Sequence, residues 1–113
     1  MPTFSTIEKF TITLPEVTVE PHFEKISFRI KRKIFLTYDQ KSHRATVKLS
    51  PIDQDVFSSA SDKIYAVNGK WGEQGWTLIE LDGVNEKLLK DAITTSFCEV
   101  APKTFAKMVR SKP

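Results

Sequence analysis

The sequence has few residues that bind metal or take part in redox reactions, and it has no long hydrophobic run. It contains one cysteine, Cys98, and two histidines, His22 and His43. A lone cysteine forms no internal disulfide, which agrees with a reducing compartment, and two isolated histidines give no metal-ligand spacing. No apolar run approaches the ~20 residues that cross a bilayer, and residues 1–5 lack both the basic and the apolar part of a signal peptide. We therefore expect a cytoplasmic protein without membrane contact, metal or cofactor.

Catalytic signatures are missing as well. Cys98 comes late in an amphipathic segment, and neither histidine belongs to a motif that would activate it as a nucleophile. The glycines of segment 68–76 suggest a phosphate loop, but Lys70 is misplaced for a Walker motif and no Ser or Thr follows it. A hairpin with positive φ angles, and without a helix, explains these glycines better. The sequence predicts no catalytic residue and a protein that is not an enzyme.

The length and composition predict one folded domain over residues 1–113. A chain of 113 residues, 40% hydrophobic and 27% charged, has the composition of an ordinary globular protein. A domain of this size hides roughly 65% of its unfolded surface, which is enough for a core without metal or disulfide support. No repeat, low-complexity tract or linker divides it.

Short elements can be placed along the first half of the chain. A helix is expected over residues 5–14, with Ser5 or Thr6 as its N-cap and Pro15 beyond its end, and residues 20–23 indicate a connection. Alternating apolar residues then predict strands over 26–30, 33–38 and 44–49, separated by turns at 31–32 and 39–42. The residues expected to face inward are Ile26, Phe28 and Ile30 in the first strand, and Ala45, Val47 and Leu49 in the third.

The second half begins with a well-marked helix, because Ser50 is a favoured N-cap and Pro51 a favoured first helical residue. Strands are expected over 63–67 and 76–81, a helix over 84–100 and a last helix over 102–109. The expected buried side of the helix after Pro51 consists of Ile52, Val56, Phe57 and Ala60. The order is helix, three strands, helix, two strands, helices. We therefore predict an α+β fold, a two-layer sandwich in which helices cover one face of a five-stranded antiparallel sheet and leave the other partly open.

Charge is unevenly distributed along the chain. The net charge is +3, but residues 22–48 hold eight basic and two acidic residues, a net charge of +6, and residues 101–113 hold four basic residues and no acid. The remaining residues therefore carry −7. Such asymmetry steers anionic partners even when the net charge is small.

Several blocks give the chain a family likeness. They resemble the MmcQ/YjbR family in order from about residue 5 to residue 108: Leu14-Pro15-Glu16-Val17, Pro21-His22-Phe23-Glu24-Lys25, Ser27-Phe28-Arg29, Lys33-Ile34-Phe35, Val47-Lys48-Leu49-Ser50-Pro51, Gly69-Lys70-Trp71-Gly72, Gly75-Trp76-Thr77 and Val100-Ala101-Pro102-Lys103. The resemblance implies a bacterial-type, double-wing DNA-binding protein, in which two hairpins beside the sheet act as wings.

The resemblance also implies a fold similar to type III secretion chaperones and to frataxin. A frataxin-like role needs an acidic ridge, whereas the 84–100 helix balances its acids with Lys87 and Lys90, which argues against iron handling. The likeness supplies no catalytic residue.

The basic strands and the glycine segment are the candidate nucleic-acid-binding sites. Alternation places Arg29 and Lys31 on one outward face and Arg44 and Lys48 on an outward face two strands along, where they can neutralise phosphates without reading sequence. At the expected loop tip, Lys70 would contact phosphate and Trp71 a base or sugar. The full set is Arg29, Lys31, Arg32, Lys33, Lys41, Arg44, Lys48, Lys70 and Trp71, with DNA favoured.

Other interpretations stay open at this point. The basic face is also explained as a solvated sheet surface whose lysines discourage aggregation. The +6 segment suits an acidic protein partner equally well, so a protein-interaction or chaperone-like module, monomeric or weakly dimeric, is the alternative function. A pocket for a small anionic ligand near Trp71 and Trp76 is a third.

Overall fold

The structure, a computed structural model, describes residues 2–110. Lys112 of the basic C-terminal segment and the side chain of Arg110 lie outside the described part. In this range the elements follow one another as α1 (Phe4–Thr11), β1 (Val17–His22), β2 (Lys25–Ile30), β3 (Lys33–Asp39), β4 (Arg44–Lys48), α2 (Pro51–Ala60), β5 (Ile64–Ala66), α3 (Lys70–Glu73), β6 (Trp76–Glu80), α4 (Glu86–Val100) and α5 (Lys103–Arg110).

The sheet has six strands in the order β1-β2-β3-β4-β6-β5, and all neighbours are antiparallel. The expected sheet of five strands, and the expected order of elements, were therefore wrong. The strand that was missed is β1, whose second half had been assigned to a connection over residues 20–23. A proline is compatible with β1 because this strand lies at the edge of the sheet, where one side of its backbone has no partner strand.

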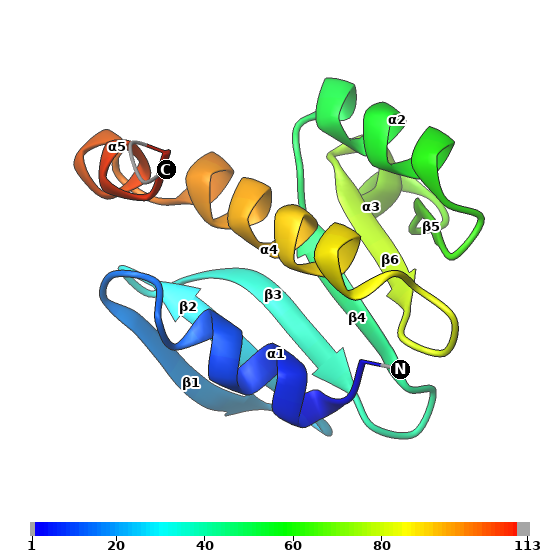
Figure 1. The fold of residues 1–113 in the computed structure, drawn as a ribbon, viewed down its shortest axis with the longest axis horizontal. Coiled ribbons are helices and arrows are strands. Elements are labelled where there is room, and N and C mark those ends of the chain that lie inside the picture. Colours follow the sequence, from blue (N-terminus) through cyan, green and yellow to red (C-terminus); the bar gives the residue numbers. More distant parts are fainter. Residues whose placement is uncertain (1, 111–113) are drawn as a thin grey trace.

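One face of the sheet carries the core. Figure 1 shows α1 and α4 lying across this face, while α2 lies beyond the β6 and β5 side of the sheet. The side chains with no exposed surface include Phe28, Ile30, Ala45 and Val47 from the strands, Leu49 just after β4, and Leu89, Ile93 and Phe97 from α4. The inward positions predicted for the first and third expected strands are thus confirmed, except that Ile26 is only partly buried.

The helix ends agree with the sequence signals in part. Ser50 caps α2 by accepting a hydrogen bond from the Asp53 N–H at 3.1 Å, as expected. Thr3, rather than Ser5 or Thr6, caps α1. The predicted buried side of α2 was wrong: Phe57 is buried, but Ile52 is 77% exposed and Val56 is 59% exposed, because α2 packs beside the sheet and not across it.

A β-bulge in β3 changes which residues face the core. Phe28 pairs with Leu36, but its neighbour Arg29 pairs with Ile34, so Phe35 has no partner on β2. Phe35 and Leu36 are consecutive and both fully buried, so Ile34 is placed on the opposite, open face. The hydroxyl of Ser96 on α4 donates to the Phe35 carbonyl at 2.7 Å and accepts from the Lys48 N–H at 3.0 Å. One buried side chain therefore satisfies backbone groups of two strands.

Replacing Ser96 by alanine is expected to destabilise the fold by about 1–3 kcal/mol, because two buried backbone groups lose their partner. Urea denaturation followed by circular dichroism measures the loss. Thr95→Ala is the matched control, since the Thr95 hydroxyl only donates back to Asp91 of its own helix at 2.8 Å, and its effect should stay within about 0.5 kcal/mol. Equal losses in the two variants would contradict this role of Ser96.

Candidate binding face on the open side of the sheet

Strand pairing builds rows of side chains across the face that α1 and α4 leave open. One row runs from edge to edge of the sheet through successive paired positions: Glu20, Ser27, Thr37, Thr46, Leu78 and Tyr65. A second pair on this face joins Lys48 of β4 to Trp76 of β6. The face therefore mixes hydroxyl groups, charges and apolar groups drawn from all six strands.

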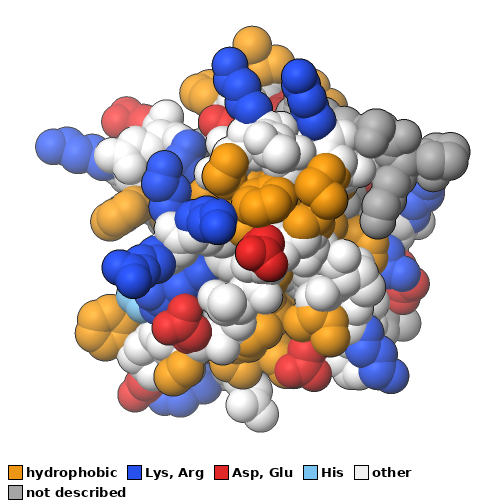
Figure 2. All heavy atoms as spheres, turned by 90° about the vertical axis from the view of Figure 1, so that its left-hand side faces the viewer, with side chains coloured by type: hydrophobic (Ala, Val, Ile, Leu, Met, Phe, Trp, Pro, Cys, Tyr) orange, Lys and Arg blue, Asp and Glu red, His pale blue; other side chains and the backbone are white. Residues whose placement is uncertain are grey.

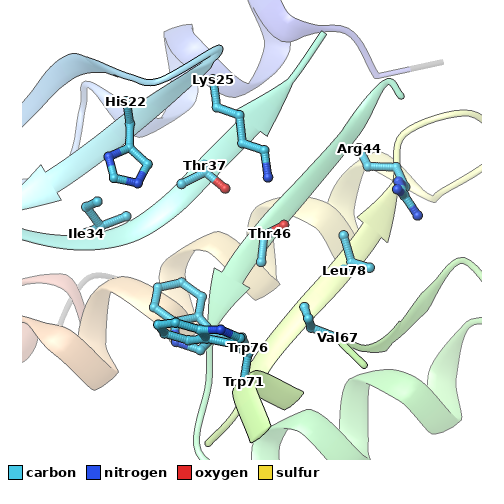
Figure 3. Close-up of a pocket in the computed structure, with 10 residues that line it drawn as sticks. All are labelled: His22, Lys25, Ile34, Thr37, Arg44, Thr46, Val67, Trp71, Trp76 and Leu78. Carbon is cyan, nitrogen blue, oxygen red and sulfur yellow. The ribbon is translucent and has the colours of Figure 1, made fainter. Parts of the chain in front are cut away.

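A hollow of about 580 Å³ lies in the middle of this face. In Figure 3, Lys25 reaches over β3 toward its centre from the β1–β2 hairpin, the two indole rings stand together at one end, and Arg44 lies on the other side. Its volume falls in the ~300–1,000 Å³ range of ligand pockets. The lining residues are His22, Lys25, Ile34, Thr37, Arg44, Thr46, Val67, Trp71, Trp76 and Leu78.

The two tryptophans at the end of this hollow are held by α2 and by close backbone packing. Their ring centroids are 6.4 Å apart and the rings meet edge to face. The Gln54 side-chain amide lies within hydrogen-bonding distance of the Gly72 and Trp76 carbonyls, at 3.0 and 3.1 Å, and of the Thr77 hydroxyl at 3.1 Å. The Gln54 side chain of α2 thus holds both the α3 segment, which bears Trp71, and the start of β6, which bears Trp76.

The glycine segment is not the plain hairpin expected from the sequence. Residues 70–73 form the short helix α3 between β5 and β6. Gly69 and Gly75 do have positive φ, +80° and +107°, as the hairpin interpretation required. A Cβ at Gly75 would overlap the Leu49 carbonyl, and a Cβ at Gly72 would overlap the Val67 carbonyl. Gly72 does not have a positive φ, so the close approach of the Val67 carbonyl explains why this position is a glycine.

Three of the expected basic site residues have polar or acidic neighbours. Arg29 donates to the Ser27 hydroxyl at 3.0 Å and lies 3.8 Å from Glu20. Lys41 pairs with Glu24 at 3.3 Å, where both side chains are exposed. Arg44 donates to the Tyr65 hydroxyl at 3.3 Å, and Tyr65 in turn donates to Glu80 at 2.6 Å. Each of these three cations therefore has a carboxylate of the fold nearby.

The electrostatic setting of Arg44 keeps it charged. The hydrogen bond to Tyr65 raises the pKa of the Arg44 guanidinium, with the nearby Glu80 charge adding to it, although desolvation acts in the other direction. Its Nε atom is buried and has no hydrogen-bond partner among the described residues. Arg44 thus brings a permanent positive charge to the hollow.

Asp39, which pairs with Arg44 across β3 and β4, is a carboxylate near the hollow. Desolvation opposes its ionisation, but hydrogen bonds from the Ser42 side chain and the Lys41 N–H outweigh it and lower the Asp39 pKa, with help from the charge of Lys25. This carboxylate is turned into its own β3–β4 turn by those hydrogen bonds and is not among the residues that line the hollow.

The β2–β3 turn carries the other expected basic residues to the end of the sheet. Lys31 and Arg32 both have positive φ there, and the Lys31 ammonium lies 5.4 Å from the centre of the Phe105 ring on α5. The expectation that Arg29 and Lys31 share the open face was wrong, because the turn directs Lys31 toward the helical layer. Lys33 is exposed next to this turn. Figure 2 looks at the end of the molecule that carries α5 and shows Lys and Arg side chains along one flank, with Asp and Glu among them.

Of the nine expected residues, the hollow brings together Arg44 and Trp71. Lys48 faces the same side but bonds the Leu49 carbonyl at 3.2 Å, and Lys70 is exposed beside Trp71. Sequence reasoning missed His22 and Lys25 as site residues. Recognising β1 would have revealed them, because a strand through residue 22 paired with residue 25 places both on the same face as Glu20 and Ser27.

The described residues contain no group of three or more His, Cys, Asp or Glu that could hold a metal ion. Cys98 is half-buried between α4 and α5, with its sulfur 3.9 Å from the Ala106 carbonyl. No helix of the described part is long and apolar enough to span a membrane.

Comparison with known proteins places this geometry in a family. The model of the YjbR family matches residues 12–99. The chain belongs to the YjbR family. Among solved structures, the crystal structure of the Deinococcus radiodurans protein DR2400, with a DUF419 domain, is similar with a TM-score of 0.78 and 21% identity, over 97% of this chain and 89% of that one. At this identity the YjbR-type likeness supports the fold alone. A search of curated proteins found no match.

Gly75→Ala is expected to destabilise the protein more than Gly69→Ala. Both changes place a Cβ at positive φ, at a cost of about 1–2 kcal/mol, but the Cβ at position 69 meets nothing within 4 Å whereas the one at position 75 overlaps a backbone carbonyl. The overlap should add about 1–3 kcal/mol and disturb the indole pair. Urea denaturation and near-ultraviolet circular dichroism measure the two effects, and equal losses would contradict this account.

Proposed function

We propose that this YjbR-family domain is a non-enzymatic nucleic-acid-binding module that uses the open face of the sheet, with DNA as the favoured partner. The observation that carries the proposal is the composition of the hollow. Its lining combines the side chains of Lys25, Arg44 and His22 with two indole rings and contains no carboxylate. Cations attract phosphates, and aromatic rings offer stacking surfaces to bases.

The proposal rests on local charge rather than on the total charge of the basic strands. Glu20, Glu24 and Glu80 lie near Arg29, Lys41 and Arg44 respectively. A carboxylate next to a cation offsets the attraction of that cation for a polyanion. Lys25 is exposed and forms no ion pair with another described residue, so we assign it the leading role in phosphate binding. The turn residues Lys31, Arg32 and Lys33, together with Lys70, form the outer wing contacts.

Removing the charge of Lys25 should weaken binding and its salt dependence together. If about three phosphates are neutralised, the logarithm of the affinity for a duplex falls against the logarithm of salt concentration with a slope of about −2.7. Lys25→Gln should bring that slope about 0.9 closer to zero. Fluorescence anisotropy with a labelled duplex across salt concentrations measures both slopes.

Lys9→Gln is the matched control, because Lys9 is an exposed lysine on α1 in the helical layer and its loss changes the net charge equally. It should leave the slope unchanged. Absence of binding at low salt, or equal effects of the two variants, would overturn the proposed function or its placement on the open face.

A second candidate function is protein interaction through α2, in the form of weak dimer formation. Ile52 and Val56 lie one helical turn apart and expose 77% and 59% of their surface. Apolar residues adjacent on a helix surface can pair with the same surface of a second copy. This would make the module a weak dimer.

Dimer formation through α2 predicts a concentration-dependent mass in sedimentation equilibrium, and the double variant Ile52→Ser with Val56→Ser should be monomeric. The control is Ile12→Ser, which removes an isoleucine that is 56% exposed at the end of α1 and should leave the dimer intact. A wild-type protein that stays monomeric at every concentration contradicts this candidate.

A further inference from the structure

The hollow on the open face has an arrangement that suits an unpaired nucleotide better than a duplex. It is recessed between the β1–β2 hairpin and the α3 segment, whereas bases in a duplex are stacked inside and present only their edges. A base reaches the floor of such a hollow only when it is unpaired. This inference rests on the proposed function, because it assumes that the open face binds nucleic acid.

One wall of the hollow is an aromatic platform. Trp71 is 63% exposed, and its ring is supported edge to face by Trp76, which is itself only partly exposed. The Gln54 hydrogen bonds and the tightly packed Gly72 fix the segment below it. A large apolar ring that is held in place and yet exposed is suited to stack against a base.

The floor supplies polar groups beside this platform. The hydroxyls of Thr37 and Thr46 form no side-chain hydrogen bond with the described residues, and both line the hollow. Figure 3 shows their oxygen atoms on either side of the nitrogen of Lys25, with the indole pair at the lower end of the view. A hydroxyl donates and accepts hydrogen bonds, so the floor can bond base edges while the ammonium holds a phosphate.

A second aromatic side chain lies next to the hollow without lining it, on the hairpin that carries His22 and Lys25. Phe23, at the tip of the β1–β2 hairpin, is 94% exposed and has a φ of +58°. Its ring meets the ring of His22, which lines the hollow, at a centroid distance of 4.8 Å. This positive φ belongs to the two-residue turn that joins His22 to Lys25, where a bulky side chain is uncommon, and the ring projects from the tip into solvent.

We propose that the open face binds single-stranded nucleic acid, with one base stacked on Trp71 in the hollow, a phosphate at Lys25 and a neighbouring base on Phe23. The strand crosses β3 and β4 between the two aromatic platforms, over Thr37 and Thr46. Arg44 provides the second fixed positive charge along this path.

Fluorescence anisotropy with a labelled oligothymidylate of about 12 nucleotides, a length within the range bound by other small domains, tests the proposal against a duplex of equal length. The wild-type protein should bind the single strand at least about tenfold more tightly, with quenching of tryptophan fluorescence. Trp71→Ala should lower the single-strand affinity by about 5- to 100-fold, the range of one stacked base. Trp71→Phe should retain most of it, and Phe23→Ala should give a smaller loss.

Ile12→Ala is the control, since it removes exposed apolar surface on the helical side and should change nothing. Equal or tighter binding of the duplex, or full affinity in Trp71→Ala, overturns the single-strand inference while leaving the proposed function standing. Binding of neither probe at low salt overturns both. Displacement of the strand by an equal concentration of free thymidine monophosphate would assign the hollow to a mononucleotide and also overturn the inference.

Discussion

The bulge at Phe35 and the Ser96 hydroxyl that joins it to β4 determine which side chains reach the open face. In an unbroken strand, Ile34 would share the buried side with Leu36, because side chains alternate with a period of two. The extra residue turns Ile34 outward, where it lines the hollow. The bulge interrupts the ladder at the Phe35 carbonyl, and a polar group left there without a partner is costly in a core. The helix α4 supplies that partner at 2.7 Å, so the helical layer and the open face are coupled through one side chain.

A similar dependence holds at the other end of the hollow. The indole pair lies on a segment that needs Gly72 and Gly75 for its close approach to the neighbouring backbone, and Gln54 reaches it from α2. The α2 helix therefore contributes to the open face without lying on it. Its outward apolar residues, Ile52 and Val56, follow from this position beside the sheet, since only Phe57 reaches the core.

Local sequence patterns predicted those parts of the fold that depend on neighbours in the chain. Alternation identified the buried side of β2 and β4, and Ser50-Pro51 identified the start of α2. The same reasoning missed β1, because a proline weakens a strand signal and only the sheet order shows that this strand lies at an edge. It also placed Lys31 wrongly, because the positive φ of a turn redirects a side chain away from strand alternation. Of the nine expected nucleic-acid-binding residues only Arg44 and Trp71 line the hollow, and Trp76 had been named beside Trp71 in the small-ligand alternative. Contacts across strands decide the rest.

The distribution of charge on the open face also changes the interpretation of the basic strands. A net charge of +6 over residues 22–48 suggested a broad cationic surface, but Glu20 and Glu80 are supplied by β1 and β6 at its two sides. Strand pairing thus places acids beside Arg29 and Arg44, and each nearby carboxylate reduces the field that a phosphate would meet. Lys25 differs because its side chain extends over the hollow, while the carboxylate of Asp39 is held by its own turn. The position of Lys25, which forms no ion pair with the described residues and lies beside aromatic rings, is consequently a better guide to phosphate binding than the charge of the whole segment.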